Sequence, residues 1–353
     1  MRKPDVKFIR ITRWTFFVPL VIYISLLYIK YNKNLKLKSS NKIDEDLEIQ
    51  RLLTELETAT IKTIDKGVNF DSLPKITNIE SEKTSNPKLL LESIFFKVDH
   101  NKNQELDIQE LAKWIYMKIT EHLESAPQNN IILFTQIDNN PRNGDISWDE
   151  YHAYFLRSHG LSENYINFHN KKHSDLPKSL KESIMRDRAR WTETARNDPE
   201  RLTLDEFLAF THPESSHRAL LQMVEDLFEK FELDRDGDEQ LTEDEFADLP
   251  SDGLGLDLQE EKLSTVKGSD GRRQEFRFLI DRNKDGKADR TELLMYIDPR
   301  NPHHAIREAQ HLIEVADINQ NNKLSLSEIL SKADLFLESK MVDTEKSFHD
   351  EFR

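Results

Sequence analysis

The chain has 353 residues, of which 33% are charged, and its 65 acidic residues outnumber its 50 basic ones, for a formal net charge of −15. Phosphate binding needs a basic face, so this balance argues against nucleic acid as a partner. The chain has no cysteine, which excludes disulfides, thiolate metal sites and a cysteine nucleophile. Its hydrophobic content of 37% is sufficient for several small helical cores but too low for a multispan membrane protein.

The first 30 residues have the pattern of a targeting segment. Five basic residues within positions 2–13 precede an apolar run from Trp14 to Ile29. This order is typical of a secretory signal, so we expect residues 1–30 to be a signal peptide or a signal anchor. The run is short for a membrane span, and no small-residue cleavage site follows it. Cleavage and retention therefore both stay open, and membrane attachment is expected only if this segment is uncleaved.

Two further segments lie outside the repeated part of the chain. Residues 31–88 are polar and lysine-rich, and an amphipathic stretch between Leu47 and Leu56 predicts a short helix within a spacer. Residues 341–353 form a C-terminal tail that ends in His-Asp-Glu-Phe-Arg. This ending is similar to a retrieval signal of the HDEL kind but closes with Phe-Arg, so whether it retains the protein stays open.

The rest of the chain repeats a pattern of oxygen-bearing side chains. A twelve-residue EF-hand loop binds Ca²⁺ through positions 1, 3, 5, 7, 9 and 12, where position 7 offers its carbonyl and position 12 is a bidentate Glu. Position 6 is usually Gly because the backbone there turns with a positive φ. Four copies fit the pattern, and they start at Asp99, Asp234, Asp281 and Asp317.

The predicted Ca²⁺ ligands of these four copies are acidic or amide side chains and the carbonyl at position 7. They are Asp99, Asn101, Asn103, Glu105 and Glu110; Asp234, Asp236, Asp238, Gln240 and Glu245; Asp281, Asn283, Asp285, Lys287 and Glu292; and Asp317, Asn319, Asn321, Lys323 and Glu328. Gly286 and Asn322 suit position 6, whereas Gln104 and Glu239 are expected to add roughly 1–2 kcal/mol of backbone strain there.

Two further copies are altered. The copy that starts at Asp138 has one inserted residue, with Pro141 inside it, and whether it binds Ca²⁺ stays open. Its candidate ligands are Asp138, Asn140, Asn143, Asp145 and Glu150. The other copy ends at Glu206 but has Ala195 at position 1 and Pro199 at position 5. Because both of these residues lack a ligand side chain, we expect this loop to be empty and to serve as a structural partner.

The position-12 glutamates define six loops, which we number 1 to 6 in chain order. They are Glu110, Glu150, Glu206, Glu245, Glu292 and Glu328, and short intervals alternate with long ones. EF-hands work in pairs, so we expect an all-α fold of six helix-loop-helix motifs in three consecutive pairs, at residues 89–160, 180–250 and 265–340. The position-8 residues would form a short β-bridge in each pair. The expected contacts are Leu106 with Ile146, Leu202 with Leu241, and Ala288 with Leu324.

Other chemistry has little support in the sequence. Outside the loops there is no Ser/His/Asp or paired-carboxylate set, so we expect no enzymatic activity. The histidines lack the spacing of a zinc motif such as H-E-x-x-H. We therefore expect His212, His217, His303 and His304 to be surface residues.

Six EF-hand motifs behind a secretory signal, with no cysteine, resemble the reticulocalbin and calumenin family of lumenal calcium-binding proteins. The similarity covers about residues 89–352 and is carried by residues 146–151, 203–207, 211–214, 295–299 and 316–321. The resemblance implies residence in the lumen of the secretory pathway, above all the Golgi. It also implies calcium-dependent self-association and the sorting or chaperoning of secretory cargo.

The loop residues and the net charge predict weak Ca²⁺ binding and association of the protein when Ca²⁺ binds. Loops without Gly at position 6 should bind weakly, near the ~10⁻⁴–10⁻³ M of extracellular modules, which suits a calcium-rich lumen. Four occupied loops, at two positive charges each, would reduce the net charge from −15 to −7 and favour association. Two alternatives stay open: a lumenal calcium buffer without specific cargo, and a membrane-anchored calcium sensor.

Overall fold

The computed structural model describes residues 49–56, 58, 86–139, 142–168, 176–231, 237–248 and 267–351. The apolar run Trp14–Ile29 and the last two residues lie outside these ranges. Within them, no helix combines the length and apolar character needed to cross a bilayer. The chain divides into two compact units, residues 1–68 and 69–353.

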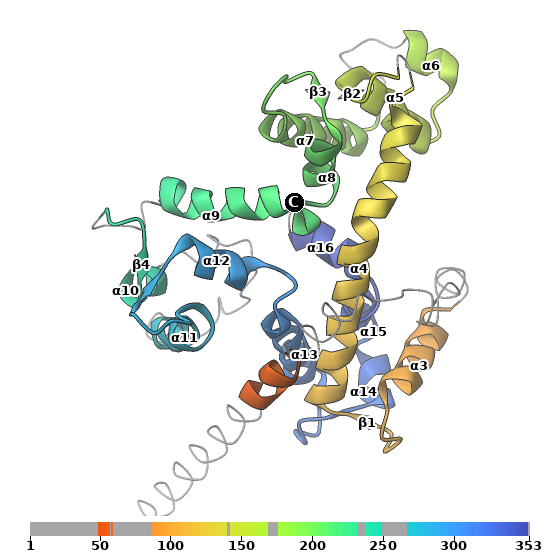
Figure 1. The fold of residues 1–353 in the computed structure, drawn as a ribbon. Helices are drawn as coiled ribbons and strands as arrows, with labels where there is room; N and C mark the ends of the chain where they lie inside the picture. Colours follow the sequence, from red (N-terminus) through yellow and green to blue (C-terminus); the bar gives the residue numbers. More distant parts are fainter. Residues whose placement is uncertain are drawn as a thin grey trace, which may run out of the picture. The chain divides into compact units, whose positions relative to one another are not determined.

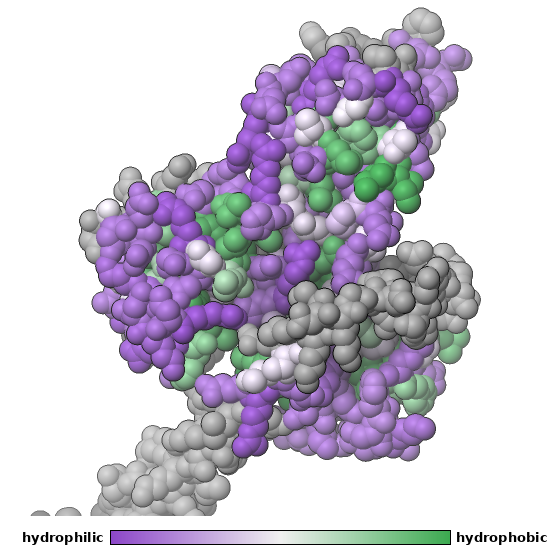
Figure 2. Space-filling model, in the orientation of Figure 1, coloured by the Kyte–Doolittle hydropathy of each residue, from purple (hydrophilic) through white to green (hydrophobic). Residues whose placement is uncertain are grey.

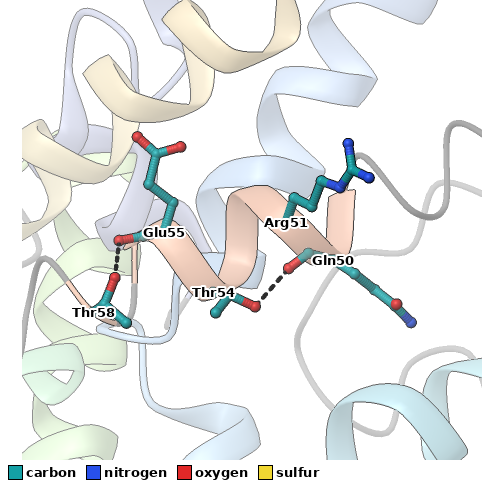
Figure 3. A pocket seen from close by; sticks show the side chains of 5 residues that line it. All are labelled: Gln50, Arg51, Thr54, Glu55 and Thr58. Carbon is teal, nitrogen blue, oxygen red and sulfur yellow. Dashed lines mark hydrogen bonds between the residues drawn. The ribbon is translucent and has the colours of Figure 1, made fainter.

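In the first unit, residues 49–56 form a helix, which confirms the short helix predicted in the spacer. Gln50, Arg51, Thr54, Glu55 and Thr58 line a depression on this stretch (Figure 3). The Thr54 hydroxyl donates to the Gln50 carbonyl at 2.8 Å, and the Thr58 hydroxyl donates to the Glu55 carbonyl at 2.9 Å. These are local bonds within one helical stretch, and we attach no function to them.

The described residues of the second unit form helices joined by loops and three antiparallel two-stranded bridges, which confirms the all-α prediction. In chain order its elements are α3 (Pro87–Val98), β1 (Glu105–Leu106), α4 (Ile108–Ile137), β2 (Ile146–Ser147), α5 (Trp148–Ser158), α6 (Glu163–Phe168), α7 (Lys178–Thr194), β3 (Arg201–Leu202), α8 (Leu204–Thr211), η2 (Pro213–Ser215), α9 (His217–Phe231), β4 (Leu241–Thr242), α10 (Glu243–Ala247), α11 (Lys267–Glu275), η3 (Phe276–Ile280), β5 (Lys287–Ala288), α12 (Arg290–Ile297), α13 (Pro302–Ala316), β6 (Leu324–Ser325), α14 (Leu326–Ser331), α15 (Ala333–Glu338) and α16 (Thr344–Glu351).

The helix that leaves each loop begins with a capping box. In loop 5, the Asp289 side chain accepts the Glu292 backbone N–H, and the Glu292 carboxylate accepts the Asp289 N–H in return. The other five loops do the same with Asp, Ser or Thr at position 9 and Glu at position 12. The position-12 Glu is thus both a predicted metal ligand and the residue that starts the helix.

The loops pair in an order that differs from our prediction. Leu106 lies opposite Leu324, Ile146 opposite Leu202, and Leu241 opposite Ala288. Three pairs joined by short β-bridges are therefore confirmed. The partners are not: loop 1 pairs with loop 6, loop 2 with loop 3, and loop 4 with loop 5, so the prediction of consecutive pairs was wrong.

Helix α4 explains the different order. It is one helix of 30 residues, with Pro127 inside it, that leaves loop 1 and enters loop 2 (Figure 1). At 1.5 Å per residue such a helix is about 45 Å long. Loops 1 and 2 lie at its opposite ends and cannot form a bridge with each other.

A hydrophobic core lies beneath each bridge. The core under β2 and β3 contains Phe134, Ile137, Ile146, Trp191, Leu202, Phe207 and Phe210. The core under β4 and β5 contains Leu220, Val224, Leu241, Phe246, Phe276, Ile280, Ala288, Leu293, Tyr296 and Ile297. Around β1 and β6, α13 packs along α4, and α14 and α15 pack on α3. Much of the face in Figure 2 is hydrophilic, as expected for residues outside these cores.

Candidate metal centres

Loop 5 shows how the loop residues are positioned. Asp281 follows the end of η3 and is 8% exposed. Its two carboxylate oxygens accept the backbone N–H groups of Asp285, at 3.1 Å, and of Gly286, at 3.0 Å. From the other end of the loop, Glu292 Oε1 accepts the N–H of Asn283 at 3.2 Å. Residues at positions 1, 3, 5 and 12 are therefore brought together around one turn of backbone.

Loops 1 and 6 repeat this arrangement. In loop 1, Asp99 accepts the N–H groups of Asn103 and Gln104, and Glu110 accepts that of Asn101 at 3.2 Å. The amides at positions 3 and 5 are held in the same way, since Asn103 Oδ1 accepts the Glu105 N–H at 2.8 Å.

In loop 6, Asp317 accepts the Asn322 N–H at 2.7 Å, and Glu328 accepts the Asn319 N–H at 3.4 Å. Asn321 Oδ1 accepts the Lys323 N–H at 2.9 Å. These are the oxygen atoms that the sequence predicts as ligands in this loop.

The backbone at position 6 has the positive φ that the pattern predicts. Its value is 82° at Gly286, 59° at Asn322, 65° at Gln104 and 64° at Glu239. Gln104 and Glu239 therefore adopt the left-handed region in spite of their side chains, as expected, at roughly 1–2 kcal/mol each.

Loop 4 is described only in part. Asp234 and Asp236 lie outside the described residues, while Asp238, Gln240 and Glu245 lie within them. Asp238 Oδ1 accepts the Gln240 N–H at 3.0 Å, and the other carboxylate oxygen of Asp238 pairs with the Lys287 ammonium of loop 5. This contact joins position 5 of one loop to position 7 of its bridged partner.

Loop 2 contains one inserted residue, but Asp138 still occupies position 1 of the loop. Asp138 is 5% exposed, and its carboxylate accepts the N–H groups of Asn143 and Gly144 at 3.0 Å each. Glu150 Oε1 accepts the Asn139 N–H at 3.3 Å, and Asn143 Oδ1 accepts the Asp145 N–H at 3.0 Å. Asp138 thus acts as position 1, as the sequence favours, whereas Asn140 lies outside the described residues.

An arginine of α9 lies close to the position-12 carboxylate of loop 3. Glu206 is 1% exposed, and an Arg218 guanidinium nitrogen lies 3.8 Å from its Oε1 atom. Burial raises the pKa of Glu206, but hydrogen bonds from the backbone of Thr203 and Arg196 outweigh it and lower the pKa overall. Arg218 places a positive charge beside a carboxylate that elsewhere is a predicted metal ligand.

The position-12 carboxylate of loop 6 is held in its ionised form. The Ser325 hydroxyl donates to Glu328 Oε2 at 2.7 Å and is the main cause of the lowered pKa of Glu328. Burial acts in the opposite direction but is outweighed. An ionised carboxylate is the state in which Glu coordinates a cation.

Two features were missed by sequence reasoning. One is the set of contacts between bridged loops, such as Lys323 with Glu105 at 3.5 Å, which cannot be seen until the loop partners are known. The other is histidine burial: His303 is 4% exposed and His212 is partly buried, so their prediction as surface residues was wrong. His217 is exposed, as predicted.

Comparison with known proteins adds direct relatives, although no model of a protein family matches the chain. It is 37% identical to the 45 kDa calcium-binding protein of Gallus gallus over 276 residues, which cover 77% of this chain and 76% of the relative. The protein of the same name from Mus musculus is 37% identical over 294 residues, with coverage of 81% and 76%. That from Homo sapiens is 36% identical over 278 residues, with coverage of 76% and 74%.

Proposed function

The chain belongs to the family of the 45 kDa calcium-binding proteins, a branch of the reticulocalbin and calumenin family, and we propose that it binds Ca²⁺ through loops 1, 4, 5 and 6. The observation that carries the proposal is the convergence of the position-1 and position-12 carboxylates in loops 1, 5 and 6. In each of these loops both carboxylates accept backbone N–H groups of the same short turn. Hard oxygen donors in this arrangement suit Ca²⁺.

The number of bound ions tests the proposal. Calorimetric titration of the full chain with Ca²⁺ should give one ion for each of the four loops. Glu292→Gln should remove the ion of loop 5, because a neutral amide cannot replace the bidentate carboxylate. Glu206→Gln, in the loop we expect to be empty, is the matched control and should leave the stoichiometry unchanged. Equal loss in both variants would contradict the assignment, and one additional ion that is lost in Glu150→Gln would assign loop 2 as well.

We further propose that the protein works in the lumen of the secretory pathway, and within it in the Golgi. There it would sort or chaperone secretory cargo when the Ca²⁺ concentration is high. The basic and apolar N-terminal segment supports entry into this pathway. Position 6 is not Gly in three of the loops, where Gln104, Glu239 and Asn322 adopt a positive φ. This favours low Ca²⁺ affinity, so these sites would fill only where Ca²⁺ is abundant. The fall in net negative charge on binding supports assembly, because it lowers repulsion between copies.

Mass and helicity separate assembly from buffering. Light scattering of the full chain should show the mass growing as Ca²⁺ rises to ~1 mM, the upper range for weak modules. The variant that carries Glu→Gln at 110, 245, 292 and 328 should stay at its initial mass. A rise in helicity at constant mass would instead favour a monomeric lumenal buffer. N-terminal sequencing of the mature protein tests the membrane-anchored alternative, since an intact Trp14–Ile29 segment would favour a membrane-anchored calcium sensor.

A further inference from the structure

A compact group of two histidines and one glutamate lies outside the EF-hand loops. His122 is on α4, His212 lies between α8 and η2, and Glu214 is on η2. His122 Nε2 is 2.8 Å and His212 Nδ1 is 3.1 Å from the same carboxylate oxygen, Oε1 of Glu214. The candidate ligand atoms of the three residues all lie within 4.8 Å of one another.

The glutamate at the centre of this group is buried. Glu214 is 3% exposed, and its Oε1 atom is the shared hydrogen-bond partner of His122 and His212. A buried charge is costly unless it is paired, and a divalent cation between the three side chains would provide that pairing.

Aromatic packing fixes the orientation of the histidine rings. The His122 ring stacks on Phe348 of α16, with ring centroids 5.4 Å apart and an interplanar angle of 26°. The His122 and His212 rings meet edge-on, with centroids 5.7 Å apart. Phe348 is 2% exposed, so the C-terminal helix is part of the support. Ligands on packed elements need little reorganisation to bind an ion.

We propose that His122, His212 and Glu214 bind a transition-metal ion, with Zn²⁺ as the best match. Imidazole nitrogen suits Zn²⁺ and its neighbours in the transition series, whereas the EF-hand loops offer only oxygen, which suits Ca²⁺. Two nitrogens and one carboxylate oxygen match three of the four positions of a tetrahedral zinc site, and water would take the fourth. Each ring would bind through the nitrogen that now faces Glu214 and carry its proton on the other nitrogen.

The ion would be held by two segments of the chain, helix α4 and the stretch from His212 to Glu214. His122 lies in the helix between loops 1 and 2, and His212 and Glu214 lie in the segment between loops 3 and 4. Phe348 adds the C-terminal helix through its stack on His122. The site would therefore fasten the middle of α4 to the segment that leads from loop 3 toward loop 4, away from the calcium loops themselves.

Zinc affinity measured on the full chain tests this inference. With the EF-hand loops saturated with Ca²⁺, competition against a chromophoric zinc chelator should show one tightly bound Zn²⁺ per chain. His122→Gln, His212→Gln and Glu214→Gln should each weaken binding more than the roughly 10–100-fold that follows loss of an outer-shell partner. His217→Gln is the matched control, because His217 is exposed, close in sequence and outside the cluster.

Cobalt provides a readout that depends on no variant. Co²⁺ added to the calcium-saturated chain should give the intense visible absorption of a tetrahedral complex, and added Zn²⁺ should remove it. The proposal is overturned if the unmodified chain shows only the weak spectrum of hydrated Co²⁺, or if His217→Gln reduces Zn²⁺ affinity as much as the cluster variants do. Unchanged helicity and Ca²⁺ stoichiometry in each variant would exclude unfolding as the cause of a loss.

Discussion

Leu106 of loop 1 and Leu324 of loop 6 face each other across an antiparallel bridge, and both side chains are completely buried. This contact joins the first EF-hand motif of the chain to the last. Helix α4 connects loop 1 to loop 2, while bridges connect loop 2 with loop 3, loop 4 with loop 5, and loop 6 with loop 1. Each of the four predicted calcium loops is therefore bridged to another of them, loop 1 to loop 6 and loop 4 to loop 5.

A cysteine pair can test the partnership of loops 1 and 6, because the chain has no cysteine of its own. Glu105 of loop 1 and Ser325 of loop 6 are directly opposite each other across the bridge, and opposed residues of an antiparallel pair have Cα atoms within disulfide range. Glu105→Cys/Ser325→Cys should therefore form an internal disulfide under mild oxidation, visible as a faster band on a gel without reductant.

The matched control places the second cysteine at position 7 of loop 2. Glu105→Cys/Asp145→Cys should stay reduced, because α4 holds these loops about 45 Å apart along its axis. A disulfide in this control and none in the test pair would restore the consecutive pairing that the loop intervals suggested.

The geometry within each loop could be predicted from the sequence, whereas the pairing of the loops could not. Asp281, Gly286 and Glu292 act within a few residues of one another, so spacing alone predicted that they gather around one turn. The capping boxes are equally local, since Asp289 and Glu292 are three residues apart. Contacts between residues only a few positions apart can be predicted from the spacing of those residues in the sequence.

Loop partners depend on contacts between distant residues, and sequence reasoning failed there. The short interval between Glu110 and Glu150 was taken to mark one EF-hand pair, but it holds the single helix α4, which continues through Pro127. The cluster of His122, His212 and Glu214 was missed for the same reason, because His122 and Glu214 share no local spacing. A continuous helical pattern through residues 108–137 was the signal that could have separated loops 1 and 2.

In loop 3, which we expect to be empty, Arg218 lies beside the Glu206 carboxylate, and the effect of removing this charge should be measurable. Arg218→Met leaves Glu206, which is 1% exposed, without its nearby cation. Because Arg218 is partly exposed and the pair is separated by 3.8 Å, we expect a loss of only about 1 kcal/mol of unfolding free energy. Denaturant unfolding of both chains gives the value.

A second substitution checks the cause of that loss. In Arg218→Met/Glu206→Gln the carboxylate is gone, so the change at 218 should have little further effect. If Arg218→Met is equally destabilising when Glu206→Gln is already present, the arginine acts through packing of its stem, and the counter-charge account is wrong.

The C-terminal segment is held by a buried hydrogen bond from α4. Trp114 Nε1 donates to the Met341 carbonyl at 3.0 Å, across 227 residues of chain. Trp114→Phe keeps an aromatic ring but removes the N–H donor and part of the indole, which leaves the buried Met341 carbonyl without this donor and should destabilise the protein by at least about 1–3 kcal/mol. Limited proteolysis should then cut the segment around residue 341 faster than in the unmodified chain. Trp148→Phe, in the motif that follows α4, is the comparison and should leave that cleavage rate unchanged.

Two neighbouring histidines on α13 should make stability fall as the pH is lowered. Burial, then the charges of His304 and Arg307, lowers the pKa of His303 well below its usual value. Burial and the Lys340 charge lower the pKa of His304 to about 3. Both rings are therefore neutral in the folded protein, whereas in the unfolded chain they take up protons below about pH 6.5.

The sign of the effect follows from proton uptake. Because the folded pKa values lie below the unfolded one, the stabilisation is complete above about pH 6.5 and is lost as the pH falls from there toward the folded values. Each histidine should remove up to about 1.4 kcal/mol between pH 6.5 and 5.5. Denaturant midpoints measured at pH 7.5 and 5.5 with saturating Ca²⁺ should record the sum.

His303→Phe separates the two contributions. Neither ring nitrogen of His303 has a hydrogen-bond partner among the described residues, so a phenyl ring of similar shape removes no bond there. The ring stacks on Tyr296 at 4.9 Å with an interplanar angle of 7°, a packing that Phe can keep. The variant should match the unmodified chain at pH 7.5 and lose about half of its sensitivity to acid. An undiminished loss at pH 5.5 would show that other groups govern the pH dependence, since the ring at position 303 would then no longer titrate.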